Sequence, residues 1–133
     1  MVTPVITLEV NDSVFEASRV MTEKHIGSIV VTENKKPVGI VTGRDILKKV
    51  VLLRLDPTKV KLGEVMSKPL LSVDVNTSIL KAIKVLKKNK IKRLPVMEDD
   101  ILKGIITDKE LFDAMALHTL TSFKLLLRRE KLG

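Results

Sequence analysis

Two short motifs in this chain combine residue types that can bind a phosphate and a sugar. Each has a threonine, two intervening residues and an acid, in Thr42-Gly-Arg-Asp45 and in Thr107-Asp-Lys-Glu110. A threonine that caps a helix lies beside unpaired backbone N–H groups and the positive end of the helix dipole, which attract phosphate. A carboxylate in the same first turn can accept both hydroxyls of a ribose. The motifs therefore predict two sites for a phosphorylated sugar.

The two motifs close two copies of one repeat. Residues 4–50 align with residues 69–115 at a constant offset of 65, without a gap. Matching positions include Val10 and Val75, Ser13 and Ser78, Ala17 and Ala82, Ile26 and Ile91, and Gly39 and Gly104. Two copies of one supersecondary unit usually bury their apolar faces against each other. We therefore expect a seam of approximate two-fold symmetry with clefts in pairs.

The Thr-x-x-acid spacing has an alternative explanation. It is also the spacing of a capping box, in which the acid accepts a hydrogen bond from the N–H of the cap residue. A single copy favours this purely structural alternative. Two copies at the mouth of a seam favour a binding site.

Each repeat is predicted to form a β-α-β-β-α unit. Ser13 and Ser78 precede apolar residues at helical spacing, and Thr42 and Thr107 precede the second helices. The expected strands lie at 5–8, 28–32, 38–41, 70–73, 94–97 and 103–106. Residues 53–65 are expected to be a connector, and a helical pattern continues from Leu111 to about Leu127. We divide the chain into a first repeat with connector (1–60), a second repeat (61–118) and a C-terminal helical extension (119–133). The C-terminal helix either packs on its own domain or, as we favour, pairs with another subunit.

These repeats resemble the cystathionine β-synthase (CBS) domain, a tandem pair of which is called a Bateman module. The matching segments are Gly39–Asp45, Gly104–Glu110, Arg93–Val96 and Gly63–Met66. The resemblance implies a mixed α/β (α+β) fold of two packed repeats. It also implies a non-catalytic sensor that requires no cofactor and binds AMP, ADP, ATP or S-adenosylmethionine between the repeats. Such a module signals energy or metabolite state to a separate enzyme or transporter and forms a face-to-face homodimer.

The resemblance also assigns residues to two sites. The stronger nucleotide site would contain Thr42, Arg44, Asp45, Ser72, Ile91, Lys92, Arg93 and Pro95. The weaker site would contain Thr7, Ile26, Gly27, Ser28, Thr107, Lys109 and Glu110. In the stronger site Asp45 would hold the ribose, and Arg44 and Arg93 would grip phosphate bidentately. The other site is expected to be weaker because Glu110 replaces the usual Asp and Gly27-Ser28 replaces Lys92-Arg93.

The composition leaves rival functions open. The formal net charge is +8, and the run Lys81–Arg93 contains seven cations and no acid. This suits an anionic ligand, a nucleic acid or an acidic partner, although a solvated surface explains it too. The chain has no Cys, Trp or Tyr, which argues against thiolate metal sites and base stacking. No apolar run or signal peptide indicates membrane insertion or export, so we expect a cytoplasmic protein. A nucleic-acid-binding protein, a structural dimerisation module and an unrecognised enzyme are the alternatives.

Overall fold

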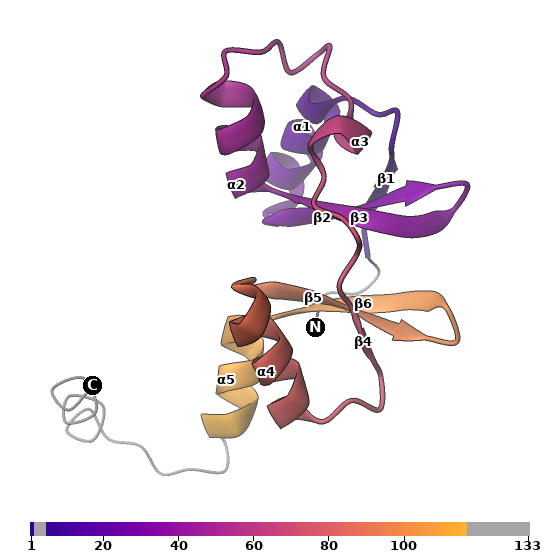
Figure 1. The fold of residues 1–133 in the computed structure, drawn as a ribbon, viewed down its shortest axis with the longest axis vertical. Coiled ribbons are helices and arrows are strands. Elements are labelled where there is room, and N and C mark those ends of the chain that lie inside the picture. Colours follow the sequence, from indigo (N-terminus) through magenta and orange to yellow (C-terminus); the bar gives the residue numbers. More distant parts are fainter. Residues whose placement is uncertain (2–4, 117–133) are drawn as a thin grey trace, which may run out of the picture.

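The computed structural model describes residue 1 and residues 5–116, which form two similar units (Figure 1). The first contains β1 (Thr7–Glu9), α1 (Val14–Lys24), β2 (Ser28–Glu33), β3 (Lys36–Thr42), α2 (Gly43–Ile46) and the π-helical turn η1 (Leu47–Val51). After α3 (Leu62–Val65), the second contains β4 (Val73–Asp74), α4 (Ile79–Asn89), β5 (Arg93–Glu98), β6 (Ile101–Thr107) and α5 (Asp108–Ala116). The predicted β-α-β-β-α order is confirmed in both repeats.

Each repeat builds a three-stranded sheet with the same topology. The order is β1-β2-β3 in one and β4-β5-β6 in the other. The outer strands β1 and β4 run parallel to their central strand, and β3 and β6 run antiparallel to it. The register shifts between Val31 and Thr32 and again between Val96 and Met97, which are matching positions. The two sheets face each other across the middle of the molecule, and the long helices cover their outer sides (Figure 1).

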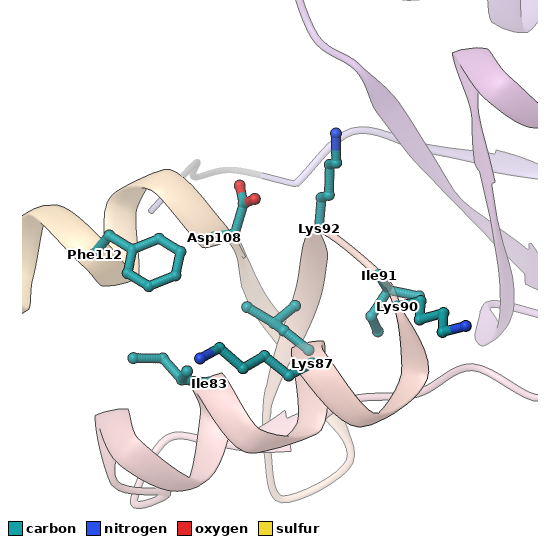
Figure 2. Close-up of a pocket in the computed structure, with 8 residues that line it drawn as sticks. Ile83, Lys87, Lys90, Ile91, Lys92, Asp108 and Phe112 are labelled. Atoms are coloured by element: carbon teal, nitrogen blue, oxygen red, sulfur yellow. The ribbon is translucent and has the colours of Figure 1, made fainter. Parts of the chain in front are cut away.

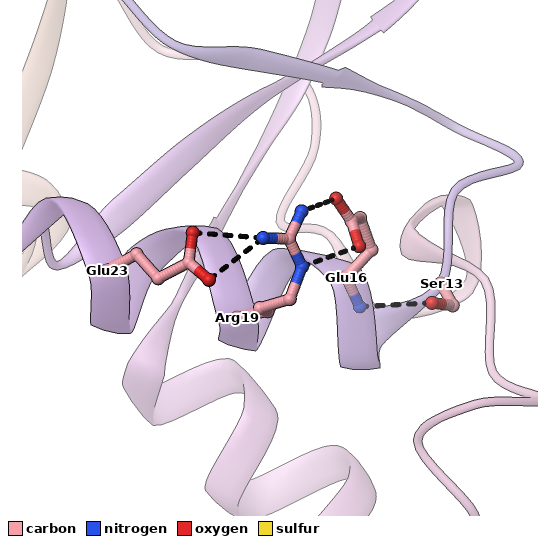
Figure 3. Close-up of polar contacts among 4 residues, drawn as sticks. All are labelled: Ser13, Glu16, Arg19 and Glu23. Carbon is pink, nitrogen blue, oxygen red and sulfur yellow. Dashed lines mark hydrogen bonds and ion pairs between the residues drawn. The ribbon is translucent and has the colours of Figure 1, made fainter.

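Local sequence explains where the long helices begin and end. The Ser13 hydroxyl accepts the Glu16 N–H at 3.0 Å, and the Ser78 hydroxyl accepts the Lys81 N–H at 3.2 Å. Both helices end in a left-handed residue, His25 and Lys90, with φ of 55° and 53°. The predicted helix starts are therefore confirmed. On the exposed side of α1, Arg19 bonds both Glu16 and Glu23, one turn away in either direction (Figure 3).

Each of the two hairpins turns through two consecutive residues with positive φ. Asn34 and Lys35 have φ of 52° and 68°, and Asp99 and Asp100 have φ of 48° and 64°. Two consecutive residues of this kind form the type of turn that matches the twist of the flanking strands. The predicted hairpins are confirmed, with strands one or two residues longer than expected at most ends.

The first strand of each repeat differs from the prediction. Expected at 5–8 and 70–73, these strands are Thr7–Glu9 and Val73–Asp74. Pairing is limited to the residues that run beside the central strand, such as Thr7 with Val30 and Val73 with Val96. Upstream of β4 the chain pairs elsewhere, because Ser67 bridges Ile40 of the first repeat.

The expected connector is part of the first core. Val60, Leu62 and Val65 are buried together with Val14 and Ile29, in a cluster that spans α1 and the first sheet. The Val60 carbonyl accepts the Val14 N–H at 2.9 Å, and the Leu62 N–H donates to the Asp12 carbonyl at 2.9 Å. The segment therefore runs across the start of α1 and encloses the core there.

The second core is smaller in the described residues. It contains Ala82, Ile83, Leu86, Leu94 and Leu111. The helix predicted to continue to Leu127 is seen as α5 up to Ala116, and the remainder of that prediction lies outside the described residues. In the part of the chain that the structure describes, no helix is long and apolar enough to cross a membrane.

Candidate functional site

The first Thr-x-x-acid motif forms a complete capping box at the start of α2. One carboxylate oxygen of Asp45, Oδ2, accepts the Thr42 N–H at 3.0 Å and the Thr42 hydroxyl at 3.1 Å. The same hydroxyl accepts the Asp45 N–H at 3.2 Å. The structural alternative for this motif is therefore realised, and it fixes the orientation of the carboxylate.

The second carboxylate oxygen of Asp45 is directed at the other repeat. Oδ1 accepts the Ser67 hydroxyl at 3.2 Å and lies 3.3 Å from the Lys49 ammonium group. Lys49 also donates to the Val65 carbonyl at 2.8 Å, so one cation joins α2 to α3. The Asp45 side chain is only 14% exposed. Asp45 thus ties the end of the first repeat to the residues that lead into the second.

Met66 and Ser67, the lead-in of the second repeat, lie against β3 of the first. Ile40 and Ser67 exchange two backbone hydrogen bonds of 3.1 and 2.8 Å. Gly39 admits this close approach, because a Cβ there would lie 2.9 Å from the Ser67 carbonyl oxygen. The lead-in is therefore joined to the edge strand β3 of the first sheet by a single antiparallel bridge.

The second motif repeats this arrangement with the other end of the chain. Thr107 donates its N–H to Oε1 of Glu110 at 3.2 Å, and its hydroxyl accepts the Glu110 N–H at 3.1 Å. Oε2 of Glu110 accepts a hydrogen bond from the Met1 ammonium group, and the Met1 side chain lies against Gly104. The hydrogen bond from the Met1 ammonium group is the main cause that lowers the pKa of Glu110, partly opposed by burial. Each acid therefore contacts the lead-in of the opposite repeat.

One contact brings the two predicted sites together across the seam. The guanidinium of Arg93, assigned to the first site, lies against Gly27, assigned to the second. A Cβ at position 27 would come within 2.8 Å of the Arg93 Cζ atom. The absence of a side chain at Gly27 is what makes room for this cation.

Strand register places each motif beside the central strand of its own repeat. Ser28 pairs with Thr42, and Arg93 pairs with Thr107. The Lys92 carbonyl accepts the Asp108 N–H at 2.8 Å in the same way that the Gly27 carbonyl accepts the Gly43 N–H at 3.4 Å. The backbone thus groups Gly27 and Ser28 with the Thr42 motif, and Lys92 and Arg93 with the Thr107 motif. The assignment of these residues to separate ligand sites stays a prediction.

The remaining predicted residues differ in accessibility. Arg44, Ser72, Thr7 and Lys109 are exposed and Ile26 is half-buried, whereas Ser28 and Pro95 are buried within the central strands. Because their side chains are buried, Ser28 and Pro95 can contribute to a site only through the backbone that they position. The sequence prediction missed Lys49 and Ser67, both bound to Asp45. The i, i+4 spacing of Asp45 and Lys49 could have indicated their ion pair. The alignment of Met66 with Met1 could have indicated that the residues around Met66, including Ser67, lead into a repeat.

Two hollows lie near these residues. One, of about 330 Å³, lies between α4, α5 and the start of β5 and includes Ile91 and Lys92 of the first predicted site (Figure 2). Its apolar wall includes Ile83 and Phe112, and its rim carries three lysines and Asp108. The other, of about 310 Å³, is lined from both repeats by Thr7, Glu9, Thr32, Lys35, Pro37, Asp100, Ile101 and Leu102. This second hollow is formed by both repeats, whereas the first is lined by the second repeat alone. The expected pairing of clefts stays a prediction.

Comparison with known proteins gives a consistent family. The CBS domain family profile matches residues 1–52 and again residues 62–117. An uncharacterised protein of Methanocaldococcus jannaschii is 45% identical over 108 residues, which cover 81% of this chain and 56% of that protein. The chain spans about half, or less, of the length of the curated relatives that it matches.

Solved structures share the whole fold. An uncharacterised conserved protein from Pyrococcus horikoshii superposes with a TM-score of 0.79 at 28% identity, covering 92% of each chain. A hexameric CBS-CP12 protein from bloom-forming cyanobacteria superposes with a TM-score of 0.80 at 28% identity, covering 92% of this chain and 72% of that one. With one profile match on each β-α-β-β-α repeat, the chain belongs to the CBS-domain family as a tandem pair of CBS domains.

Proposed function

We propose that this chain is a non-catalytic regulatory module that binds an adenine nucleotide, such as AMP, ADP or ATP, between its two repeats. Pairs of CBS domains commonly act as regulatory modules that bind ligands. The observation that carries the proposal is that Asp45 makes two kinds of contact. One carboxylate oxygen caps α2, and the other contacts the lead-in of the second repeat.

Asp45 is suited to hold a ribose. Its Oδ2 atom is occupied by the capping box, whereas its Oδ1 atom bonds a serine hydroxyl at 3.2 Å. A ribose hydroxyl has the same hydrogen-bonding character as the Ser67 hydroxyl and can replace it without leaving a buried acceptor unpaired. Ribose binding at Oδ1 would therefore release Ser67 while the helix cap stays in place.

Cations near the motifs supply the attraction for phosphate. Arg44 is exposed in the first turn of α2, and the Arg93 guanidinium lies at the seam against Gly27. A guanidinium can bind two phosphate oxygens at once. An S-adenosylmethionine ligand carries no phosphate and would gain less from these groups, so we favour a nucleotide.

Signalling would follow from exchange of partners at Asp45. When a ribose displaces Ser67, the lead-in loses one of its links to the first repeat, and the equilibrium between two placements of the repeats shifts. Such a shift can be no larger than the difference in ligand affinity between the two placements. A separate enzyme or transporter that contacts both repeats would respond to it.

The test is thermal unfolding of the protein with AMP, ADP, ATP and S-adenosylmethionine, each at a saturating concentration. A ligand present at about 100 times its dissociation constant stabilises the folded state by about 2.7 kcal/mol. We expect a rise in Tm with a nucleotide that is lost in Asp45→Ala. Ser67→Ala should keep the rise, because it removes only the serine that competes for Oδ1.

The matched control is Glu110→Ala, which removes the equivalent acid of the predicted weaker site. It should leave most of the nucleotide response in place. Binding that survives Asp45→Ala but not Glu110→Ala would reverse the ranking of the two sites. If none of the four ligands raises Tm in the wild-type protein, the proposal is wrong.

We also propose that the module forms a homodimer. Exposed apolar side chains on and after η1 give it a surface for a second copy, namely Leu47, Val51, Leu52, Leu53 and Leu55. The hexameric cyanobacterial neighbour is an example of a CBS-domain protein that assembles with itself.

A second candidate function is binding to nucleic acid or to an acidic partner through α4. Lys81, Lys84 and Lys88 are all exposed on this helix. Contacts of this kind with phosphates weaken steeply with salt and carry little sequence preference. A salt titration of binding to duplex and single-stranded nucleic acid distinguishes this function from nucleotide sensing.

A further inference from the structure

The start of α4 is open in the described residues, whereas the matching start of α1 is covered. Val14, the first residue of α1, is 0% exposed, and its counterpart Ile79 is 42% exposed. Val10 is half-buried, and its counterpart Val75 is 38% exposed. Equivalent apolar side chains of the two repeats therefore differ in exposure to solvent, although the helices and sheets that carry them match.

The cover in the first repeat is the segment that follows η1. The Pro57 carbonyl accepts the Phe15 N–H at 3.0 Å, and the Val60 carbonyl accepts the Val14 N–H at 2.9 Å. Val60 and Leu62, which belong to this segment, are buried in the first core and are 7% and 0% exposed. The segment thus closes the core and also satisfies two of the N–H groups that every helix start leaves unpaired.

The second repeat lacks an equivalent cover within residues 5–116. No backbone carbonyl of that part accepts the N–H of Ile79 or of Leu80. Leu80 is 63% exposed and Val75 is 38% exposed beside Ile79. Within residues 5–116, an apolar patch therefore lies beside two N–H donors that have no backbone acceptor, at positions whose counterparts are occupied in the first repeat.

The sequence after α5 has the length and the residues to provide this cover. The offset of 65 carries Val60 and Leu62 onto Leu125 and Leu127, and carries Lys61 onto Leu126. The segment from Ala116 to Leu127 is as long as the segment from Val51 to Leu62, which covers the start of α1. We propose that residues 120–127 fold back over the start of α4 and bury Leu125 and Leu127 against Ile79.

A segment of the same chain is a better occupant than a second molecule. It is tethered at Ala116, the counterpart of Val51, so its effective concentration at the patch is high. The cover is expected to end at Leu127. A Cβ at Gly63 would lie 3.3 Å from the Val10 Cβ atom, and the counterpart of Gly63 is Arg128, so the two paths must separate there.

A disulfide test uses the absence of cysteine from the chain. Ser13 and Lys61 form an antiparallel bridge in the first repeat, and their counterparts are Ser78 and Leu126. Residues opposed in this way lie within the Cα separation that a disulfide spans, about 4.4–6.8 Å. The Ser13→Cys/Lys61→Cys protein is the matched control for Ser78→Cys/Leu126→Cys, since both pairs remove a helix cap.

We expect both double-cysteine proteins, oxidised at low concentration, to form an intramolecular disulfide. Disulfide-linked dimers from the second pair would place another copy at α4 and overturn the proposal. No disulfide in the second pair, when the first forms one, would also overturn it.

Single substitutions in the full chain give an independent readout. The counterpart of Leu127 is buried Leu62, and the counterpart of Leu126 is exposed Lys61. Leu127→Lys should therefore speed amide hydrogen exchange at Ile79 and Leu80 by about tenfold or more, whereas Leu126→Lys should not change it. Equal exchange rates in the two variants would refute burial of Leu127 at this site.

Discussion

At the scale of single residues, Gly27 and Arg93 form a contact whose two members come from different repeats. The guanidinium occupies the space in which a Cβ of residue 27 would lie, within 2.8 Å of Cζ. Arg93 pairs with Thr107 through β5, so a change at Gly27 reaches the second motif through one side chain.

Gly27→Ala should displace the Arg93 side chain and lower stability by about 1–3 kcal/mol, the usual cost of overpacking. In the Arg93→Ala background the same substitution should cost much less, because the clash is gone. Chemical denaturation of the four proteins of this cycle measures the coupling. Equal costs of Gly27→Ala in the two backgrounds would show that the guanidinium lies elsewhere.

A second residue-scale prediction concerns Glu16. The hydrogen bond from Arg19 lowers the pKa of this carboxyl below its ordinary value of 4.5 (Figure 3). Because the folded-state pKa is the lower one, the interaction stabilises the fold above pH 4.5, and this contribution is lost as the pH falls through the folded-state pKa. Arg19→Gln should raise the pKa of Glu16 toward the ordinary value, as followed by NMR titration. A pKa that is unchanged in Arg19→Gln would contradict the pairing.

At the scale of elements, the segment between the repeats is a structural part of the first one. Leu62 is fully buried, and Leu55, seven residues earlier in the same segment, is 46% exposed. Replacing a buried leucine with alanine removes apolar contacts and leaves a cavity, whereas an exposed leucine contributes little.

Leu62→Ala should therefore lower the free energy of unfolding by about 2–5 kcal/mol. Leu55→Ala is the matched control and should change it by no more than about 0.5 kcal/mol. Denaturant titration of both variants is the measurement. A similar small effect of the two substitutions would mean that the segment is only a linker.

Sequence patterns predicted the elements whose causes are local. Ser13 and Ser78 cap the helices expected from them, and Asn34-Lys35 and Asp99-Asp100 form the turns expected between apolar strands. The burial of Val60, Leu62 and Val65 was missed because it depends on contacts with α1, about 50 residues earlier. The positions of β1 and β4 were missed for a similar reason, since their extent depends on pairing with distant central strands.

The candidate site was predicted only in its local part. Thr42 with Asp45 and Thr107 with Glu110 form the expected contacts within one helical turn. The partners of the second carboxylate oxygens, Ser67 and Met1, come from the opposite repeat and carry no local signal. Hydrogen bonds that cross the seam follow from how the repeats are docked, which spacing along one chain does not specify.

At the scale of the whole molecule, the apolar surface formed by η1 and the residue that follows it favours self-association. Leu47, Val51 and Leu52 are 58%, 55% and 73% exposed in one short stretch. An exposed apolar patch of neighbouring residues is typical of an interface, whereas single exposed apolar residues are common on any surface.

Leu52→Lys should weaken the proposed homodimer, because it places a charge in that apolar surface. Sedimentation velocity over a range of concentrations measures the shift from dimer to monomer. Ile101→Lys is the control, as Ile101 is also 58% exposed but lies in the β5–β6 hairpin. A dimer that is weakened by Ile101→Lys and not by Leu52→Lys would place the interface on the hairpin side.

The exchange of lead-ins bears on the ancestry of the molecule. Met66 lies against Gly39 of the first repeat, and Met1 lies against Gly104 of the second, so each repeat is completed by residues that belong to the other. This reciprocal arrangement is that of a symmetric dimer of single repeats after gene duplication and fusion. A half-length ancestor would have been complete only as a pair, and fusion would have freed each half to diverge, as the difference between Asp45 and Glu110 illustrates.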